Sequence, residues 1–377
     1  MHKPRILEVN KFYPPHIGGI ETLIQMISEG LQSRSSLSVL VCRDQRGGKE
    51  ITVQNGIRVH ACGSWGTYFS CPLSFSFFPA FFRQAKQADV IHFHTPFPLG
   101  DLACLLSRYQ GRVVISWHSD VVKQKRLRAL YLPIMRRFLD RADAVIVATQ
   151  GHIDSAPELI RIREKCHIIP YGICSADYLH APRTPYLTAR AKDPAAKKVF
   201  FAGRLVYYKG VDVLLEAFAK TDGCELFLAG EGGLEQTLRE RAEELAVSDR
   251  VHFLGRLPDA DLKSAFADCD LFVLPSVQNS EAFGIVQLEA MVYGKPVINT
   301  SLPTGVPCVS LDGQTGLTVP PGDADALRTA IQTLVNDDAL RRTYGAAAKQ
   351  RVLAEFERDK MLDRIFALLT NTESKEE

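Results

Sequence analysis

Two acidic residues, Glu281 and Glu289, stand eight positions apart after an apolar segment of strand length, 271–275. The order of residue types predicts a strand, a loop and a helix that starts near Gly284, with Glu289 about 7 Å along its axis. Free N–H groups at such a helix start favour a phosphate. A ligand with a hydroxylated ring at each end and a diphosphate between them, such as a nucleotide sugar, would fit. The spacing alone fits a loop acid and an unrelated surface glutamate equally well.

Two cations, Arg204 and Lys209, follow a second strand-like run that begins at Lys198. A diphosphate leaving group needs such cations, because negative charge builds on its oxygens as the bond to the sugar breaks. On its own, an arginine five residues before a lysine is most often ordinary surface charge. Only the position of the two cations, in a loop between a strand and a helix, indicates that they bind a diphosphate.

In the first half of the chain, glycines and histidines mark the ends of strand-like runs. Gly18 and Gly19 follow the first run and would let a ligand approach the backbone closely, although such a pair alone is more often a turn. The dinucleotide fingerprint GxGxxG is absent, which disfavours an NAD-dependent oxidoreductase. His94 and His118 each end a later run, where a lone histidine is more often a satisfied polar residue than a catalytic one.

These residues must be positioned by alternating strands and helices. In the first half the strand-like runs are 6–10, 37–42, 57–62, 89–94, 112–119, 144–148 and 167–169. Helix-like segments separate most of them, which predicts parallel βαβ units with the site at the carboxyl ends of the strands. A chain of 377 residues is long for one core, so we expect two domains, 1–180 and 195–356, joined by a proline-containing connector.

The stretch Glu281-Ala-Phe-Gly-Ile-Val-Gln-Leu-Glu289 resembles the donor-site motif of the retaining family 4 glycosyltransferases, which have the GT-B fold. The resemblance implies two Rossmann-like domains facing a cleft, with the last segment, 357–377, returning to the first domain. It implies catalytic roles for His118, Arg204, Lys209 and Glu281. It implies donor-binding roles for Gly18, Gly19, Gly230, Arg256, Leu257, Ala282, Phe283, Gly284, Ile285 and Glu289. His94 is a weaker candidate. One departure is the segment 301–307, where family members often carry a Gly-Gly loop.

Among these enzymes the chain looks most similar to bacterial mannosyltransferases of polysaccharide and O-antigen assembly, on the segments Asn10–Pro15, Trp117–Asp120 and Thr304–Pro307. GDP-mannose is therefore the expected donor, and a UDP-linked hexose is the alternative. No Asp-x-Asp motif stands where a metal-dependent transferase would need one, so we expect neither a metal nor another cofactor. An alternative of a different class is a non-catalytic subunit that binds sugar nucleotides.

Composition adds bounds on partners and location. Forty-five basic and 43 acidic residues leave a net charge of +2, which says little about partners. We expect no nucleic-acid partner. Nine scattered cysteines and the absence of a signal-like apolar start predict a cytoplasmic protein. An aromatic segment, 68–82, and a basic amphipathic segment, 123–138, suggest a saccharide or polyprenyl-linked acceptor and peripheral contact with an anionic membrane. Both segments fit a packing loop and a solvated helix face equally well.

Overall fold

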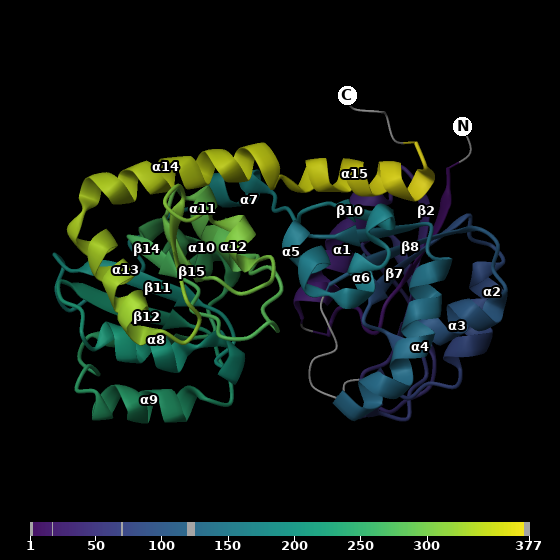
Figure 1. The fold of residues 1–377 in the computed structure, drawn as a ribbon, viewed down its shortest axis with the longest axis horizontal. Helices are drawn as coiled ribbons and strands as arrows, with labels where there is room; N and C mark the ends of the chain where they lie inside the picture. The colour runs from purple at the N-terminus through teal and green to yellow at the C-terminus, as the bar shows by residue number, and fades with distance from the viewer. Residues whose placement is uncertain (1–2, 17, 69–70, 119–124, 373–377) are drawn as a thin grey trace. The chain divides into compact units, whose positions relative to one another are not determined.

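The computed structural model describes residues 3–16, 18–68, 71–118 and 125–372, with the backbone alone for 125–130. The chain divides into two compact units (Figure 1). The first comprises residues 1–169 together with 361–377, and the second comprises 170–360. The first domain predicted from the sequence runs to residue 180, whereas the segment from Pro170 groups with the second unit.

The first unit is built on a sheet whose strand order is β10-β9-β8-β7-β1-β2-β4-β3. Its strands are β1 (Arg5–Val9), β2 (Ser36–Cys42), β3 (Glu50–Gln54), β4 (Ile57–Cys62), β7 (Val90–Thr95), β8 (Arg112–Trp117), β9 (Ala144–Val147) and β10 (Cys166–Ile168). All neighbouring pairs in this sheet are parallel except β3 with β4. Strand β3 and a short hairpin of β5 (Thr67–Tyr68) and β6 (Cys71–Pro72) were not predicted from the sequence.

Helices cover this sheet and complete its core. They are α1 (Gly19–Leu31), α2 (Phe77–Ala85), α3 (Pro98–Ser107), α4 (Lys125–Arg141), α5 (Gln150–Ser155), α6 (Pro157–Ile160) and α15 (Arg358–Thr370). Phe77 and Phe81 of α2 are fully buried beside Phe93 and Phe138. The aromatic segment therefore supplies core residues from α2 onward, whereas Phe75, just before it, is 69% exposed.

The second unit is built on a parallel sheet with the order β13-β12-β11-β14-β15-β16. Its strands are β11 (Lys197–Ala202), β12 (Cys224–Ala229), β13 (Val251–Gly255), β14 (Leu271–Val273), β15 (Val297–Thr300) and β16 (Gly316–Val319). Its helices are α7 (Ser175–Leu179), α8 (Val211–Phe218), α9 (Glu235–Glu244), α10 (Asp259–Asp268), α11 (Val286–Val292), α12 (Val306–Val309), α13 (Ala324–Asn336) and α14 (Asp338–Glu355). The central strands β11, β12 and β14 are apolar and buried at their centres, as expected of parallel strands covered on both faces.

The last helix, α15, belongs with the first unit from Met361 onward (Figure 1). It buries one face there, and Leu362 reaches so close to Gly30 of α1 that a side chain at Gly30 would collide with it. Arg34 forms an ion pair with Asp363, with 2.5 Å between nitrogen and oxygen. The return of the final helix to the first unit agrees with the expectation from the sequence.

Candidate functional site

In the second unit, the neighbouring strands β11 and β14 bring two loops together at their carboxyl ends. The loop after β11 contains a short 3₁₀ turn, Tyr207–Lys209, and ends at Gly210, whose φ of 65° favours glycine. A side chain at Gly210 would collide with the carbonyl of Pro275, which lies just after β14. The N–H of Val277 donates to the carbonyl of Tyr208 over 2.9 Å, so the two loops are fixed against each other.

This junction places Lys209 beside Glu281. The Lys209 Nζ lies 2.6 Å from Glu281 Oε2, and their side chains are only 11% and 10% exposed. The Ser276 hydroxyl donates to the same carboxylate oxygen over 3.0 Å. A lysine paired and desolvated in this way is held in one place, and an incoming phosphate would share its charge with Glu281.

The loop that follows Glu281 contains a run of backbone N–H groups that are not used within the described structure. Gly284 has a φ of 72°, and a side chain there would collide with Leu274. The buried ring of Phe283 packs against Tyr171 with 4.9 Å between ring centroids, so Phe283 can reach a ligand only through its backbone. Among the hydrogen bonds between described residues, the N–H groups of 282–285 have no acceptor in the protein. Helix α11 itself begins at Val286, two residues later than the sequence indicated.

Glu289 lies on the first turn of α11 and is contacted by a residue that was not predicted from the sequence. The Tyr178 hydroxyl, from α7, donates to Glu289 Oε1 over 2.8 Å. Burial raises the pKa of Glu289, and the Tyr178 hydrogen bond opposes that rise. The Glu289 carboxylate could accept from two neighbouring hydroxyls of a ligand if the Tyr178 hydroxyl shifted away from it.

The remaining residues predicted for the second unit lie in its other loops. Gly230 has a φ of 134° and packs against the carbonyl of Gly203, so glycine is required there by the fold itself. Arg256 and Leu257 follow β13, with Arg256 exposed. Arg204 is also exposed and donates to the Tyr208 hydroxyl over 3.1 Å. Within the described part of the chain, we find no carboxylate paired with Arg204.

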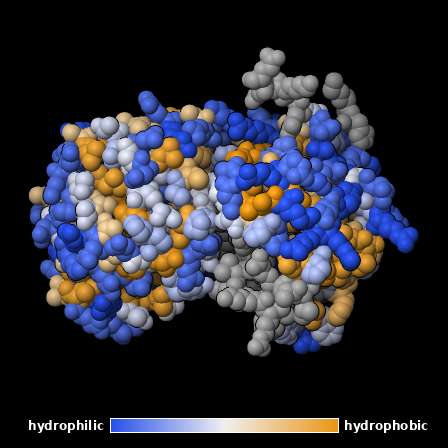
Figure 2. Space-filling view, viewed as in Figure 1, coloured by the Kyte–Doolittle hydropathy of each residue, from blue (hydrophilic) through white to orange (hydrophobic). Residues whose placement is uncertain are grey.

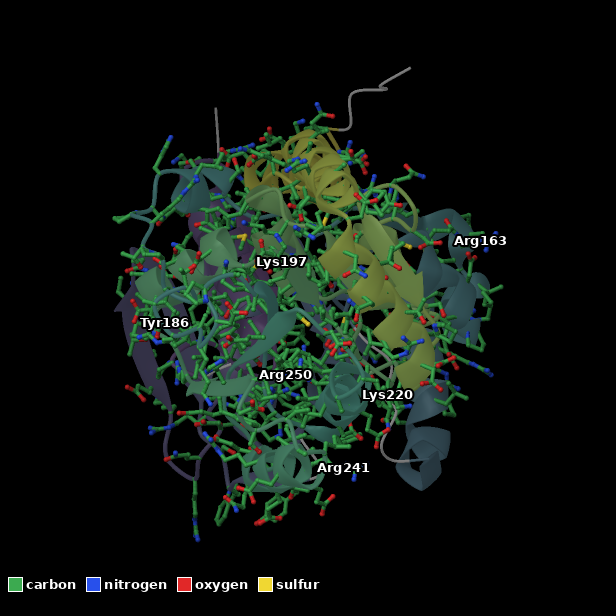
Figure 3. All side chains as sticks on the ribbon, turned by 90° about the vertical axis from the view of Figure 1, so that its left-hand side faces the viewer. Arg163, Tyr186, Lys197, Lys220, Arg241 and Arg250 are labelled. Carbon is green, nitrogen blue, oxygen red and sulfur yellow. The ribbon has the colours of Figure 1, made fainter. Side chains whose placement is uncertain are left out.

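Other cations of the second unit are engaged in local ion pairs. Figure 3 looks onto this unit, with Lys197, Lys220 and Arg241 labelled. Lys220 pairs with Asp325, Arg241 with Glu216 and Glu244, and Lys197 with Asp338. These contacts stabilise the surface modestly. Arg204 differs from them in lacking such a partner among the described residues.

In the first unit, a buried chain of polar groups runs across β1, β7 and β8. Glu8 lies opposite His92 in the register of β1 and β7, and His94 lies opposite Ser116 in the register of β7 and β8. Glu8 Oε2 lies 2.9 Å from His92 Nδ1 and 2.8 Å from His94 Nε2. The other nitrogen of His94, Nδ1, lies 2.9 Å from His118 Nε2. The structure thus joins His118 and His94, both predicted from sequence, to Glu8, which was not.

The charges in this chain follow from burial and pairing. Burial alone would raise the pKa of Glu8, but the two histidines outweigh it and lower that pKa to about 2. Burial lowers the pKa of His94 to about 4 and that of His118 well below its usual value. At neutral pH this row of buried groups therefore holds the Glu8 carboxylate and neutral imidazoles at His94 and His118. The ligand atoms of Glu8, His92 and His94 also lie within 4.8 Å of one another, a spacing that a metal ion could bridge.

Gly18 and Gly19 lie at the start of α1 in the same unit. Gly18 is extended, with a φ of −173°, and Gly19 has room for a side chain in the folded protein. Neither position therefore needs glycine for its backbone conformation. A nearby cavity of about 410 Å³ is lined by Phe12, Tyr13, His16, Asp44, Thr52 and Gln54, among others. Its mixture of aromatic and polar side chains could accommodate a saccharide.

The segments proposed from sequence to contact a membrane are described only in part. Lys123 lies outside the described residues, and the side chains of Lys125, Arg126 and Arg128 are likewise not described. Arg136 and Arg137, later on α4, are exposed. On the face seen in Figure 2, hydrophilic and hydrophobic residues are interspersed. Among the described residues, no helix combines the length and apolar character needed to cross a bilayer.

Comparison with known proteins gives matches over both units. The family profile described as Glycosyl transferases group 1 matches residues 186–351, and that of Glycosyltransferase Family 4 matches residues 17–176. O-antigen chain mannosyltransferase C of Escherichia coli is 32% identical over 97% of this chain and 98% of its own. D-rhamnosyltransferase WbpZ of Pseudomonas aeruginosa is 32% identical over 92% of this chain and 91% of its own. The structure of Anabaena HepE in complex with UDP has a TM-score of 0.80 at 22% identity, covering 97% of this chain and 100% of that one.

Proposed function

Because this chain belongs to the family 4, or group 1, glycosyltransferases, we propose that it transfers mannose from GDP-mannose to a saccharide or polyprenyl-linked acceptor in polysaccharide synthesis. The fold expected from the resemblance, GT-B with two Rossmann-like domains, is confirmed. The proposed reaction retains the configuration of the sugar and needs no metal. An acceptor hydroxyl attacks the anomeric carbon, the bond to the diphosphate oxygen breaks, and the hydroxyl proton passes to the departing phosphate.

The observation that carries the proposal is the buried contact between Lys209 and Glu281. In this reaction Lys209 and Arg204 stabilise the charge that develops on the diphosphate, in the place of a metal ion. The N–H groups of Ala282, Phe283, Gly284 and Ile285 add neutral donors beside these cations. Glu281, next to Lys209, then faces the sugar that is attached to that diphosphate.

The nucleoside is at the other end of the donor from the sugar, and we assign it to the side of Glu289 on α11. Glu289 accepts the ribose hydroxyls, with Tyr178 beside it. The loops that contain Gly230, Arg256 and Leu257 are assigned to surround the base. In the first unit, His118 binds a hydroxyl of the donor sugar, and Gly18 and Gly19 give the donor room to approach the backbone. The acceptor is assigned to the first unit, where the cavity beside Tyr13 offers a polar and aromatic lining.

Mannose is favoured by the relative from Escherichia coli, which aligns with nearly the whole chain. The D-rhamnosyltransferase relative supports a second candidate sugar, and a UDP-linked hexose stays the alternative donor. A site that hydrogen-bonds a sugar hydroxyl rejects an analogue lacking that hydroxyl by a large factor. Comparing mannose with its 6-deoxy form, D-rhamnose, therefore separates the first two candidates.

A thermal-shift panel of GDP, UDP and ADP, each with EDTA or magnesium, tests the nucleotide and the metal. GDP should give the largest shift, with or without magnesium, and a ligand at ~100 times its Kd adds ~2.7 kcal/mol. NMR of the sugar product should then show the anomeric configuration of the donor. Equal shifts for all three nucleotides, or a strict requirement for magnesium, would contradict the proposal. A protein that binds GDP-mannose yet neither hydrolyses nor transfers it would instead be a non-catalytic subunit.

For location, we propose a cytoplasmic enzyme that contacts the membrane peripherally, since a polyprenyl-linked acceptor lies in the bilayer. The basic helix α4 and the exposed side chains near the β5–β6 hairpin are the surfaces we assign to that contact.

A further inference from the structure

We infer that Gln287 and Asn299 are positioning residues for the donor diphosphate, because their amides fix the direction of the backbone N–H groups that receive it. The inference deepens the proposed function and rests on it for the identity of the ligand. It gives a task to two polar side chains that are fully buried in the second unit, one on α11 and one on β15.

The loop that leads into α11 has its carbonyl groups bonded to the protein. The carbonyl of Ala282 accepts from the N–H of Gly305 over 2.7 Å. The carbonyl of Phe283 accepts from Gln287 Nε2 over 3.1 Å. The carbonyl of Gly284 accepts from the backbone N–H of Gln287 over 2.9 Å. Three consecutive carbonyls of the loop therefore have donors, and Gln287 supplies two of them.

The direction of each N–H group in this loop follows from the carbonyl before it. In a planar trans peptide, the C=O of one residue and the N–H of the next point in opposite directions. Because the carbonyls of 282–284 are bonded to the protein, the N–H groups of 283–285 point away from those donors. None of these N–H groups has an acceptor among the described residues. Successive N–H groups that point the same way form a site for an anion.

Carbonyl groups, which can only accept, set the orientation of the two amides. Asn299 Nδ2 lies 3.1 Å from the carbonyls of Val306 and Ser310, so this atom is the donor end. It also lies 2.9 Å from Gln287 Oε1, which must therefore be the oxygen. Gln287 Nε2 then faces the carbonyls of Phe283 and Val306, over 3.1 and 3.2 Å. Turning either amide over would place its oxygen against two carbonyls.

The remaining oxygen of Asn299 fixes the network to the sheet. Thr318 Oγ1 donates to Asn299 Oδ1 over 2.7 Å, and the two residues lie opposite each other in the register of β15 and β16. Every polar atom of both amides thus has a partner, as a buried network requires. The network is anchored on two strands, and Gln287 links it to the carbonyl of Phe283.

The same network accounts for the segment 301–307, which departs from the family pattern. Val306 begins α12, and its carbonyl accepts from both amides. Gly305, one residue earlier, is the donor to the carbonyl of Ala282. The two amides therefore hold the Phe283 carbonyl directly and the Ala282 carbonyl through this segment.

The peptide between Phe283 and Gly284 depends most on the network. Among the described residues, its carbonyl has no donor other than Gln287 Nε2. Without that amide, rotation at Gly284 would turn the peptide over, since glycine permits backbone conformations that other residues do not. A carbonyl would then stand where the Gly284 N–H should be, and it would repel the phosphate oxygens.

NMR can observe this peptide alone, because Phe283 and Gly284 form the only Phe-Gly pair in the sequence. Full-length protein labelled with carbon-13 at the phenylalanine carbonyls and nitrogen-15 in glycine gives one signal in an HNCO experiment. GDP at saturation should shift the Gly284 proton strongly downfield and leave the Phe283 carbonyl carbon nearly unmoved, because Gln287 already holds that carbonyl. Guanosine, which lacks the diphosphate, should shift neither. An unmoved Gly284 proton, or a large shift of the Phe283 carbon, overturns the inference.

Gln287→Met tests the role of the amide, because methionine has a similar length but no hydrogen-bond donor. We expect it to weaken GDP binding roughly ten- to hundred-fold, the effect of losing a hydrogen bond to a charged group. Guanosine binding should be unchanged, and the Phe283 carbonyl carbon should move upfield as its hydrogen bond is lost. Wild-type affinity for GDP in this variant overturns the inference. The wild-type titration decides the matter even if the variant does not fold.

Thr318→Val is the matched control, because it removes a hydrogen bond of the same network that involves no carbonyl of the loop. It should keep the wild-type ratio of GDP affinity to guanosine affinity. An equal loss of this ratio in Thr318→Val and Gln287→Met would indicate a general packing role and overturn the inference.

The same measurements separate this inference from the proposed function. If the wild type shows the expected GDP shift but transfers no sugar from any nucleotide sugar, the proposed function fails while the positioning role stands. If UDP binds in place of GDP, the comparison of UDP with uridine tests Gln287 in the same way, and only the proposed donor fails.

Discussion

At the scale of single residues, glycine has two different purposes in the candidate site. Gly230 has a backbone conformation and a contact with Gly203 that exclude any side chain. Gly19 has ordinary helical geometry and open space around the position of a Cβ atom. The fold therefore requires glycine at the first position but not at the second, where we propose that the donor approaches.

Alanine substitutions should separate these purposes. We expect Gly230→Ala to lower the melting temperature clearly, because a positive φ and a backbone collision both oppose the new side chain. Gly19→Ala should melt as the wild type does but lose transfer activity. Calorimetric melting with a transfer assay checks both, and a fully active Gly19→Ala would contradict the assignment of Gly19 to the donor.

The two acids of the motif should respond differently to substitution. Glu281→Gln should lower turnover strongly while GDP still binds, because GDP carries no sugar and Lys209 loses its competitor for the phosphates. Glu289→Gln should weaken GDP and GDP-mannose alike, by about 1.5–3 kcal/mol for a charged hydrogen bond. Titration calorimetry with GDP on both variants measures this, and the opposite pattern would reverse the proposed orientation of the donor.

Asp101 of α3 predicts a pH dependence of stability that is unrelated to the site. Its side chain is buried, Tyr131 donates to it, and its Oδ1 has no partner among the described residues. Burial raises the pKa of Asp101 to about 7. Between its ordinary pKa and 7, the folded state binds more protons than the unfolded state, so stability falls as pH rises through that range.

Asp101→Asn removes this titration. The variant should match the wild type near pH 4.5 and exceed it at pH 8, by on the order of 2 kcal/mol in the free energy of unfolding. Urea unfolding at both pH values gives the difference. A constant difference across the range would show that the Asp101 carboxyl does not titrate in this way.

Some of the site's residues could be read from sequence and others could not. Lys209, Glu281 and His118 belong to a motif or a strand end. Glu8 interrupts an otherwise apolar strand, and an acid there must be paired when buried, but the identity of its partners depends on the register between strands. Tyr178 lies 111 positions before Glu289, and no local pattern links them.

At the scale of elements, predictability followed burial. Strands β1, β8 and β11 were predicted to within two residues at each end, because their apolar runs are buried on both faces. Strand β3 was missed because it is largely exposed and pairs antiparallel at the sheet's edge. Helix α11 starts late because Gly284 keeps the backbone in a left-handed conformation before it.

The β5–β6 hairpin and its flanks form an element with a prediction of its own. Trp65, Tyr68 and Phe75 are 59%, 60% and 69% exposed, and the Arg46 guanidinium lies 5.3 Å from the centroid of the Trp65 ring. Arg46, Lys49 and Trp65 line one groove on the surface of this unit. Aromatic rings beside cations suit the interface of an anionic bilayer, where each cation contributes ~1 kcal/mol.

The double variant Trp65→Ser and Phe75→Ser should therefore sediment less with vesicles that contain anionic lipid, while GDP binding is unchanged. Leu106→Ser, which changes a residue that is 58% exposed on α3, is the control and should sediment as the wild type does. Equal sedimentation of all three proteins would leave no role for this hairpin at a membrane.

At the scale of the whole molecule, the chain passes between its two units twice, and the two passages are paired. The N–H of Ile173 donates to the carbonyl of Phe356, and the N–H of Arg358 donates to the carbonyl of Ile173, each over 2.9 Å. A side chain at Gly172 would collide with the backbone of 357–358. The outgoing and returning segments are thus held side by side before α15 joins the first unit.

Because α15 completes the first unit, its core residues should control that unit's stability. Ile365→Ala should destabilise it by about 2–5 kcal/mol, the usual cost of such a truncation in a core. Hydrogen exchange should accelerate in β1, β7 and β8 but much less in β11 and β12. Leu353→Ala, at a partly exposed position of α14, is the control and should change neither set.

The return of α15 also sets an order of events while the ribosome makes the chain. The second unit is one continuous segment, 170–360, and can fold as soon as it has emerged. The first unit, although its strands are synthesised before the second unit, lacks the helix that covers Gly30 of α1 until α15 has been made. The half of the enzyme that is made first is therefore the half that is finished last, and until then its apolar surface is open to chaperones.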